Sequence, residues 1–384
     1  MTAFDDLSLA KLRGRASAKW TTYPADVLPA WVAEMDFPLA EPIKQRLRRA
    51  IDSDDCGYAQ PRSVPPAFVA FAKSRYGWTV DPARVSVAPE VMVAVAEILR
   101  VVTRAGDGVV INPPVYPPFF STIKEVERAA VEVPLAHVPG GGWDLDLHAL
   151  EKAFEAGAKA YLLCNPHNPT GRVLEKAQLE VIAQLAKRYG VVVIADEIHG
   201  PLTLPGAVHV PFVSVSEPIG ANAITVTSAS KAWNVAGLKC AVIVAGSPAM
   251  QSALRKLPKE FEERTGHLGV IANVAAFEEG APYLEGLLAQ LDRNRTLLAE
   301  LLGMYLPAVR YLPPQAGYLA WLDCSALGLG DDPAKVFLKQ GKVALMRGLD
   351  FGRQGACFTR VNMGTSGAIL SEVVGRMGKA IEKS

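Results

Sequence analysis

The sequence predicts an α/β fold in which a mostly parallel sheet is joined by crossover helices. Between about residues 80 and 250, short runs rich in valine and isoleucine alternate with amphipathic stretches, which is the pattern of repeated strand–helix units. The runs are apolar throughout, as expected of strands that are buried on both faces of a sheet. The chain has 384 residues, enough for two or three domains of roughly 150 residues each.

The individual elements follow from the same kinds of pattern. Leucine and alanine at helical spacing predict a helix over 175–189 that ends at Gly190, and a leucine-rich repeat predicts a long helix over 283–306. We also expect a strand at 84–87, an apolar segment at 317–322 and a terminal helix at 370–381. The central strands are expected at 108–111, 160–164, 191–195, 223–227 and 240–245.

Near residue 275 the alternating apolar runs give way to a leucine-rich helical pattern, and this change indicates two domains. Residues 45–280 are expected to form a large domain that binds a ligand, and residues 1–44 with 281–384 a smaller α+β domain built from both chain ends. The first forty residues are irregular and interrupted by prolines. We expect them to pack against the C-terminal part of the chain.

The charge balance argues against several classes of partner. The chain carries 40 basic and 39 acidic residues, a net charge of +1, which supplies little attraction for nucleic acid or an anionic membrane. No uninterrupted run of the roughly 20 apolar residues that span a membrane is present. The five cysteines lack the spacing of a CxxC or zinc site, so we expect reduced thiols, no metal and a cytoplasmic protein.

Polar and aromatic residues follow four successive apolar runs, at the ends where open parallel sheets bind ligands. NPPVYPPF (112–119) follows the first run, NPHNPTGR (165–172) the second, DEIH (196–199) the third and SASK (228–231) the fourth. One edge of the sheet is therefore predicted to bring together an aromatic ring, an amide, a carboxylate, two hydroxyls and an amine.

This set of groups suits pyridoxal phosphate, a cofactor that is stacked, kept protonated and covalently tethered. Lys231 is the candidate for the tether and for moving the α-proton of a small amino-acid substrate, because burial depresses the pKa of a lysine. Asp196 is the candidate partner of the pyridine nitrogen. Ser228, Ser230 and Lys239 are candidate phosphate ligands beside a helix N-terminus.

Longer motifs over nearly the whole chain resemble those of the fold type I pyridoxal-phosphate enzymes, the class I/II aminotransferase superfamily. Within that superfamily the chain is similar to the MalY/PatB-type carbon–sulfur β-lyases, which include cystathionine β-lyases. The resemblance implies cleavage of L-cystathionine or another cysteine thioether by α,β-elimination to a thiol, pyruvate and ammonia. The motifs are WVAEMDFP (31–38), CGY (56–58), PVYPPF (114–119), PHNPTGR (166–172), DEIH (196–199) and SKAWNVAGLK (230–239).

The resemblance implies roles for single residues around the cofactor ring. Lys231 carries the cofactor and Asp196 pairs with the pyridine nitrogen. Asn168 bonds the ring hydroxyl oxygen, Tyr116 stacks on the ring, and His199 lies beside it. These implied roles agree with the positions of the same residues after the predicted strands.

The resemblance also implies contacts beyond the ring. Arg360, in FTRVNMG, forks onto the substrate carboxylate, a geometry that lysine cannot reproduce. Trp31 borders the substrate. Tyr58 reaches the phosphate of the neighbouring subunit, so the implied assembly is a homodimer with shared active sites.

Three positions depart from the pattern of these lyases. Glu34 replaces an aspartate and is one methylene longer. Glu90 stands where a glycine is common in the phosphate-binding turn, so the backbone amides of Val91 and Met92, rather than a side chain, are expected to bind phosphate. After DEIH the family commonly has a residue and an aspartate, whereas this chain has Gly200 and a proline.

The nearest alternative is transamination, because lyases and transaminases both begin with loss of the α-proton. Common transaminases carry tyrosine three residues after the aspartate that pairs with the pyridine, whereas this chain has His199, as the lyases do. A buried imidazole bonded to the backbone is an equally good interpretation of His199. His167 and Trp233 are expected to be structural.

Two further classes stay open at this point. Ser228 and Lys231 match the S-x-x-K pattern of serine acyl transferases, and RTG (264–266) imitates their K-T-G element, but no S-D-N element occurs. The fold could also serve as a non-catalytic regulator. Such a protein would not need Lys231, Asp196 and Arg360 together.

Overall fold

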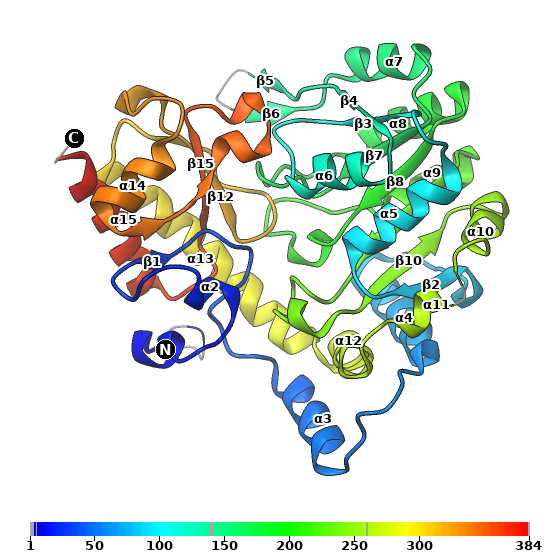
Figure 1. The fold of residues 1–384 in the computed structure, drawn as a ribbon, viewed down its shortest axis with the longest axis horizontal. Coiled ribbons are helices and arrows are strands. Elements are labelled where there is room, and N and C mark those ends of the chain that lie inside the picture. The colour runs from blue at the N-terminus through cyan, green and yellow to red at the C-terminus, as the bar shows by residue number, and fades with distance from the viewer. Residues whose placement is uncertain (1–3, 5, 139–141, 259, 383–384) are drawn as a thin grey trace.

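The computed structural model describes residues 4, 6–138, 142–258 and 260–382. A seven-stranded sheet with helices around it forms one part of the protein, and a four-stranded sheet with its own helices lies beside it (Figure 1). Among the described residues, no helix combines the length and the apolar character that a membrane crossing requires.

The large sheet contains the six strands predicted for this region, each to within one residue at either end, and a seventh at 129–132 that was not predicted. Its strands are β2 (Val85–Ala88), β3 (Gly108–Ile111), β4 (Ala129–Glu132), β7 (Ala160–Cys164), β8 (Val192–Asp196), β9 (Ala223–Thr227) and β10 (Ala241–Ala245). They follow the order β2-β10-β9-β8-β7-β3-β4. Along the run β9-β8-β7-β3-β4 each strand is parallel to the next, which confirms the mostly parallel sheet.

Strand β10 is the exception, because it runs antiparallel to both β9 and β2. The sheet is therefore mostly, and not wholly, parallel, as the sequence predicts. Only a short 3-10 turn (Ala236–Leu238) lies between β9 and β10, and parallel neighbours are usually joined by a crossover helix. The connection instead returns as a loop, which carries Ser228 to Lys239 past the end of the sheet.

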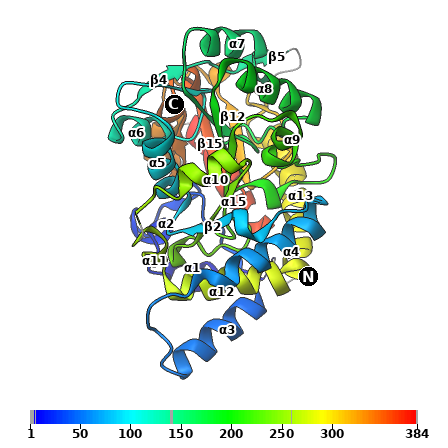
Figure 2. The ribbon, with the colours of Figure 1, turned by 90° about the vertical axis from the view of Figure 1, so that its right-hand side faces the viewer.

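Helices cover both faces of this sheet (Figure 2). Alternate residues of β7 belong to different packing layers: Leu162 packs with the first group of helices and Tyr161 with the second. Strands β7, β8, β9 and β10 are buried along their whole length, as predicted, whereas the edge strand β4 is mostly exposed. The first group is α5 (Val91–Val102), α6 (Pro118–Glu125) and α10 (Pro248–Leu254); the second is α4 (Val64–Tyr76), α7 (Leu147–Glu155), α8 (Lys176–Tyr189), α9 (Phe212–Ile219) and α12 (His267–Glu279).

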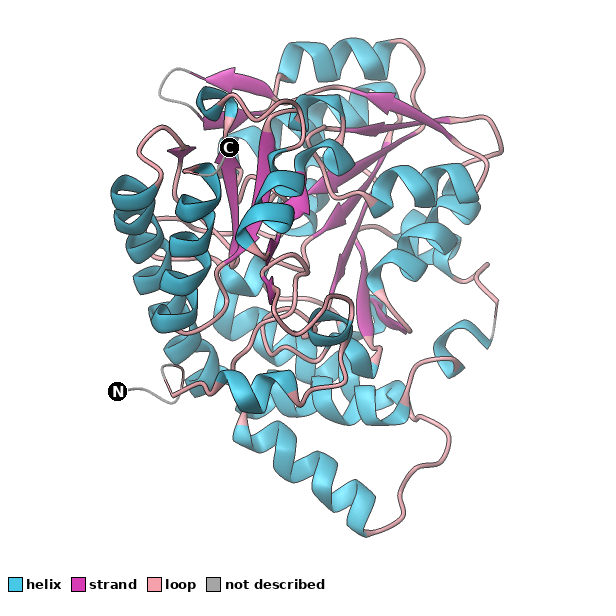
Figure 3. Ribbon diagram, turned by 60° about the vertical axis from the view of Figure 1, so that its left-hand side comes forward, coloured by secondary structure: helices cyan, strands magenta, loops and turns pink. Residues whose placement is uncertain are grey.

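The smaller sheet is antiparallel and lies beside the C-terminal helices (Figure 3). Its strands, in spatial order, are β11 (Arg310–Tyr311), β12 (Leu319–Asp323), β15 (Phe358–Asn362) and β14 (Met346–Arg347). The associated helices are α13 (Ala281–Tyr305), α14 (Pro333–Gly341) and α15 (Gly367–Ile381). The long helix and the terminal helix lie where the sequence predicts them.

The N-terminal segment packs against the C-terminal part, which confirms that expectation. Strand β1 (Leu28–Pro29) pairs with β13 (Val343–Ala344), and Leu28 faces Val343 in this ladder. Helix α3 (Glu41–Asp52) stands out from the body and contacts α12 (Figure 1). The remaining short elements are α1 (Leu9–Arg13), α2 (Ala18–Thr21), α11 (Glu260–Glu263), β5 (Ala136–Val138) and β6 (Gly142–Asp144).

Candidate active site

A cavity of about 230 Å³ lies where β7 and β8 end, at Cys164 and Asp196. This is the edge at which the sequence predicts a site, since the carboxyl ends of β3, β7, β8 and β9 meet there. Nine of the predicted residues line the cavity: Val91, Met92, Tyr116, Asn168, Asp196, His199, Ser230, Lys231 and Lys239.

Lys231 places its amine inside this cavity and donates to the carbonyl oxygen of Ala33 at 3.2 Å. Burial lowers the pKa of Lys231 from 10.5 to about 8. Burial is the largest cause of this shift and the guanidinium of Arg360 contributes to it, while Asp196 and Glu90 oppose it. Near neutral pH a larger fraction of this amine than of an ordinary lysine is therefore unprotonated and nucleophilic.

Asp196 is the last residue of β8 and is buried at the cavity wall. Burial raises the pKa of Asp196 to about 7, although the N–H of Ile198, which donates to its Oδ1 at 3.1 Å, and the nearby Lys231 favour the charged form. A cationic N–H donor bound in the cavity would stabilise the charged form of this carboxylate and lower its raised pKa.

Arg360, on β15, reaches the same site from the smaller sheet. Its Nη1 donates to Oδ1 of Asn168 at 2.9 Å, and its Nη2 donates to the carbonyl of Trp31 at 3.0 Å. Burial lowers the pKa of Arg360 to about 10, so the guanidinium stays charged at neutral pH. Its buried Nε has no partner among the described residues, which leaves a donor for a ligand.

His199 and Tyr116 supply uncharged rings. Burial lowers the pKa of His199 to about 3 and raises that of Tyr116 to about 12, so both side chains are neutral near pH 7. Within the described part of the chain, the buried Nδ1 of His199 has no hydrogen-bond partner. The alternative of an imidazole bonded to the backbone is therefore not what the structure contains.

Backbone and side-chain donors meet at one end of the cavity, around the start of α5. Val91 and Met92 are the first residues of that helix, whose N–H groups are free of intrahelical partners. Ser230 and Lys239 line the cavity nearby. The ammonium of Lys239 contacts the carboxylate of Glu90 at 2.5 Å.

Four predicted residues are not part of the cavity lining: Arg360, which contacts the lining residue Asn168, and Ser228, Trp31 and Tyr58. Ser228 is buried, and its hydroxyl donates to the carbonyl of Cys240 and contacts the hydroxyl of Ser230, both at 2.6 Å. Trp31 offers its carbonyl to Arg360, while its indole packs against Tyr23. Tyr58 is 97% exposed and is not part of the cavity wall.

The polar partners of Ser228 also bear on the serine acyl transferase alternative. Its hydroxyl is engaged with Cys240 and Ser230, and the Lys231 amine is engaged with Ala33. The Ser–Lys hydrogen bond on which that chemistry depends is thus not among the contacts of the described residues. This geometry argues against the acyl transferase interpretation.

Pattern reading missed several residues of the site. Ala33 contributes a backbone carbonyl, which accepts from Lys231 and also from the hydroxyl of Tyr318 at 2.9 Å. No side-chain signal could have identified it. Cys164 also lines the cavity, and its position as the last residue of β7 is a signal that could have been used.

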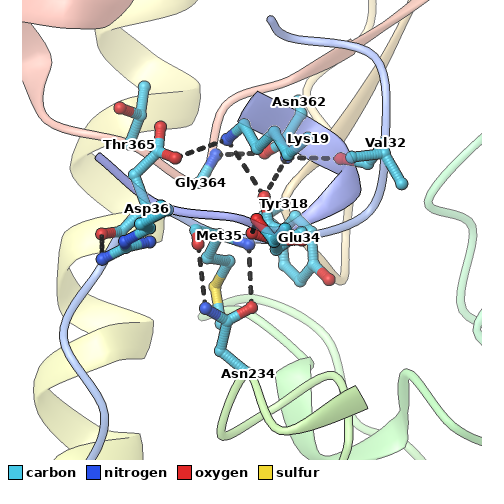
Figure 4. Close-up of polar contacts among 12 residues, drawn as sticks. Lys19, Val32, Glu34, Met35, Asp36, Asn234, Tyr318, Asn362, Gly364 and Thr365 are labelled. Atoms are coloured by element: carbon cyan, nitrogen blue, oxygen red, sulfur yellow. Dashed lines mark hydrogen bonds and ion pairs between the residues drawn. The ribbon is translucent and has the colours of Figure 1, made fainter. Parts of the chain in front are cut away.

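The segment around Ala33 is held by side chains from several elements (Figure 4). Nδ2 of Asn362 donates to the carbonyls of Val32 and Glu34 at 2.7 and 2.6 Å. The longer side chain of Glu34 accepts from the hydroxyl of Ser17 at 2.6 Å. The carboxylate of Glu34 is thus used in binding the N-terminal segment and not in lining the cavity.

Of the two residues after DEIH, Gly200 has a packing explanation, whereas nothing in the structure explains Pro201 in place of an aspartate. A Cβ on Gly200 would lie 2.8 Å from Nε2 of His209, which is buried. The next residue, Pro201, offers its carbonyl to Nη2 of Arg75 at 3.2 Å. Glycine at this position therefore makes room for the imidazole of His209, which sequence reasoning did not single out.

Two expected structural residues behave as predicted. Trp233 is fully buried, and its Nε1 donates to the carbonyl of Gly280 at 3.1 Å. His167 is buried, with Nε2 at 2.8 Å from the carbonyl oxygen of Pro114, and burial lowers its pKa to about 4.

A larger hollow of about 930 Å³ lies between the β5–β6 hairpin and β11–β12. Its two arginines already have acidic partners: Arg172 pairs with Asp144 at 3.0 Å and Arg310 with Asp323 at 3.3 Å. The smaller cavity, with its buried amine and carboxyl, is the better candidate for chemistry.

Comparison with known proteins identifies the family of the chain. The sequence profile of the family described as "Aminotransferase class I and II" matches residues 35–377. A "Putative cystathionine beta-lyase" of Mycobacterium leprae is 44% identical, over 98% of each chain. "Cystathionine beta-lyase PatB" of Bacillus subtilis is 34% identical, over 96% of this chain and 97% of the relative.

Solved structures extend the similarity to three dimensions. The structure of a putative PLP-dependent beta-cystathionase from Corynebacterium diphtheriae superposes with a TM-score of 0.92 at 34% identity, over 99% of each chain. The profile covers most of the sequence and the relatives match over nearly their full length, so the chain belongs to the aminotransferase class I and II family.

Proposed function

We propose that the protein is a pyridoxal-phosphate-dependent carbon–sulfur β-lyase that cleaves L-cystathionine or another cysteine thioether to a thiol, pyruvate and ammonia. One observation carries the proposal: a buried amine, Lys231, and a buried carboxyl, Asp196, line one small cavity together with the ring of Tyr116. Relatives and a structural neighbour named as cystathionine β-lyases support the choice of reaction.

The residues present fit the cofactor. Unpartnered polar atoms, Nδ1 of His199 and Nε of Arg360, lie at or beside a cavity that also exposes the start of α5. When bound, pyridoxal phosphate supplies a pyridine ring that withdraws electrons from the substrate's α-carbon. Asp196 is proposed to bind the ring nitrogen and to keep it protonated.

The other contacts divide between the ring and the phosphate. Tyr116 is proposed to stack on the ring face and His199 to lie beside it, while Asn168 bonds the ring hydroxyl. The phosphate is assigned to Lys239, the Ser230 hydroxyl and the free N–H groups of Val91 and Met92. The hydroxyl of Ser228 is hydrogen-bonded to that of Ser230 and is proposed to orient it.

Lys231 is proposed to tether the cofactor and then to take the α-proton of the substrate. Its lowered pKa makes the neutral amine available for both tasks. Arg360 is proposed to bind the substrate carboxylate, with its guanidinium oriented by Asn168 and by the carbonyl of Trp31. Loss of the α-proton allows the Cβ–S bond to break, and the thiolate leaves with the bonding pair.

We further propose a homodimer in which Tyr58 of one subunit reaches the phosphate of the other. The exposure of Tyr58, at 97%, fits a residue whose partner lies outside its own chain. The division into residues 45–280 and 1–44 with 281–384 is kept as the proposed domain organisation. The cysteine pattern supports the cytoplasm as the proposed location.

Absorbance of the purified protein tests the cofactor and its tether. After incubation with pyridoxal phosphate, the wild type should absorb near ~420 nm, and Lys231→Ala should lose that band. Lys187→Ala is a matched control, because Lys187 lies in α8 and donates to the carbonyl of Ile219 instead of facing the cavity. A wild-type protein without the band would contradict the cofactor assignment.

A further inference from the structure

The ion pair between Glu90 and Lys239 lies at the wall of the cavity where the cofactor phosphate is proposed to bind. Both residues line the cavity, and the ammonium and carboxylate are 2.5 Å apart. The charge of Glu90 also acts on Lys231 and on Tyr116, raising the pKa of each. The carboxylate is therefore an anion close to the reacting groups.

Glu90 does not perform the ordinary task of its position. It is the N-cap residue of α5, yet its side chain accepts no hydrogen bond from the N–H groups of that helix. These N–H groups, at Val91 and Met92, stay available for an anion. The carboxylate of Glu90 binds Lys239 instead and leaves the end of the helix uncapped.

The backbone of Lys239 is held in place, so that the side chain is the part that can adjust. Lys239 has a left-handed backbone with φ of 59°, and its carbonyl accepts from the N–H of Gly266 at 3.3 Å. A Cβ on Gly269 would lie 2.2 Å from the carbonyl oxygen of Leu238. The loop therefore packs closely on α12. A change of ion-pair partner at Lys239 would involve its side-chain ammonium and not its backbone.

We propose that Glu90 is an internal anion that holds Lys239 until the cofactor phosphate replaces it, and that Glu90 thereby weakens cofactor binding and speeds cofactor exchange. The inference rests on the proposed cofactor site. A dianionic phosphate and a carboxylate compete for the same ammonium, and they repel each other when both are near it. A glycine at this position would carry no carboxylate and so would cause neither the competition nor the repulsion.

The expected effect of Glu90 on cofactor affinity is small because both side chains of the ion pair are partly exposed to solvent. The side chains of Lys239 and Glu90 are 56% and 40% exposed, and ion pairs with this degree of solvent contact are weak. Removal of the Glu90 charge should therefore raise the affinity for pyridoxal phosphate by about two- to fivefold. The rate of cofactor release should fall by a similar factor.

The test compares pyridoxal phosphate with pyridoxal, which lacks the phosphate, in phosphate-free buffer. Dissociation constants come from the absorbance band of the bound cofactor, and release rates from transfer to a trapping amine. Glu90→Gln should bind pyridoxal phosphate more tightly and release it more slowly. Its gain for pyridoxal should be smaller, because only the effect of Glu90 on the pKa of Lys231 remains there. Glu97→Gln is the matched control: it removes a carboxylate from the same helix, where Glu97 pairs with Arg100, and should change neither affinity.

A Lys239→Gln background separates competition from simple repulsion. If Glu90 acts by holding Lys239, the gain from Glu90→Gln should shrink when Lys239 is absent. An equal gain in both backgrounds would contradict the hold on Lys239. Weaker binding by Glu90→Gln would also overturn the inference, since Glu90 would then be orienting Lys239 for the phosphate.

The inference and the proposed function fail in different ways. A wild type that binds pyridoxal phosphate with no gain in Glu90→Gln overturns the inference and leaves the lyase proposal intact. A wild type that binds no pyridoxal phosphate overturns the proposed function, and the role of Glu90 falls with it.

Discussion

The side-chain amide of Asn234 binds both backbone polar atoms of Met35: its Oδ1 accepts from the N–H at 2.9 Å and its Nδ2 donates to the carbonyl at 2.8 Å (Figure 4). Asn234 lies three residues beyond Lys231, and Met35 lies two residues beyond Ala33, whose carbonyl accepts from the Lys231 amine. One amide thus ties the turn that carries the lysine to the segment that covers it.

Replacement of Asn234 by alanine should loosen this connection. Met35 is fully buried, so two backbone groups would lose their partners, and the free energy of unfolding should fall by about 1–3 kcal/mol. Displacement of Ala33 relative to Lys231 should lower kcat/KM by roughly ten- to hundredfold.

Denaturant unfolding and steady-state kinetics of the cofactor-loaded Asn234→Ala variant measure both effects. Asn222→Ala serves as the control, because Asn222 bonds Ser247 at an exposed position. Wild-type stability and activity in Asn234→Ala would show that the segment is held by its other contacts alone.

A buried ion pair fixes the same segment from the N-terminal side. Nζ of Lys19 lies 2.8 Å from Asp36, and their side chains are 1% and 2% exposed. Lys19→Met should destabilise the protein by about 3–5 kcal/mol, because it leaves a buried carboxylate without its partner. The double variant Lys19→Met/Asp36→Leu should recover a large part of this loss.

Thermal or denaturant unfolding of these variants checks the prediction. Lys342→Met, which breaks the exposed pair with Asp26, should change stability by no more than about 1 kcal/mol. If Lys19→Met were as mild as Lys342→Met, the buried pair would not be holding the segment.

The pH dependence of amine reactivity should follow the lowered pKa of Lys231. The neutral amine is the reactive form, and its fraction rises with pH. Imine formation between the cofactor-free protein and an aromatic aldehyde should therefore be half-maximal near pH 8, the folded-state pKa, instead of near 10.5. Lys231→Ala provides the background from other amines.

Two neighbours of Lys231 should shift this midpoint in opposite directions. Asp196 stabilises the ammonium, so Asp196→Asn should move the midpoint to lower pH. Arg360 destabilises the ammonium, so Arg360→Met should move it to higher pH. Shifts of the same sign in both variants would be inconsistent with the assigned electrostatics.

The packing of His209 against Gly200 should make Gly200→Ala costly. The new Cβ would lie 2.8 Å from Nε2 and 2.9 Å from Cδ2 of the buried imidazole, and overpacking of this kind costs about 1–3 kcal/mol. Adding His209→Ala should relieve the clash that Gly200→Ala introduces.

Unfolding measurements with a second glycine variant calibrate this result. Gly303→Ala lies within α13 with no atom near its added Cβ, so it should stabilise the helix by roughly 0.5–1 kcal/mol. A Gly200→Ala variant that behaved like Gly303→Ala would remove the packing explanation for glycine at position 200.

Much of the site could be predicted because it depends on where strands end. Asp196 terminates a buried strand, and Tyr116, Asn168 and Lys231 follow three others, so a parallel sheet brings them to one edge. The sequence pattern does not determine the direction in which a strand runs or the way in which a side chain points. The run of β10 is as apolar as its neighbours, and its antiparallel direction depends on the missing crossover helix.

Orientation explains the remaining differences. Ser228 and Ser230 are both strand-end hydroxyls, and the backbone of the loop decides that Ser230 lines the cavity while Ser228 bonds the carbonyl of Cys240. Ala33 acts through a carbonyl, which every residue possesses. The partner of Glu90 lies 149 positions away in the chain, beyond the reach of local pattern.

The fate of the substrate's sulfur and nitrogen tests the central claim most directly. The cofactor-loaded protein is incubated with L-cystathionine in the absence of any keto acid, and thiol, pyruvate and ammonia are quantified over many turnovers. A β-lyase built on Lys231 should release the three products in equal amounts, and Lys231→Ala should release none. Turnover that requires an added keto acid, with amino transfer and no pyruvate, would contradict the lyase assignment and identify a transaminase.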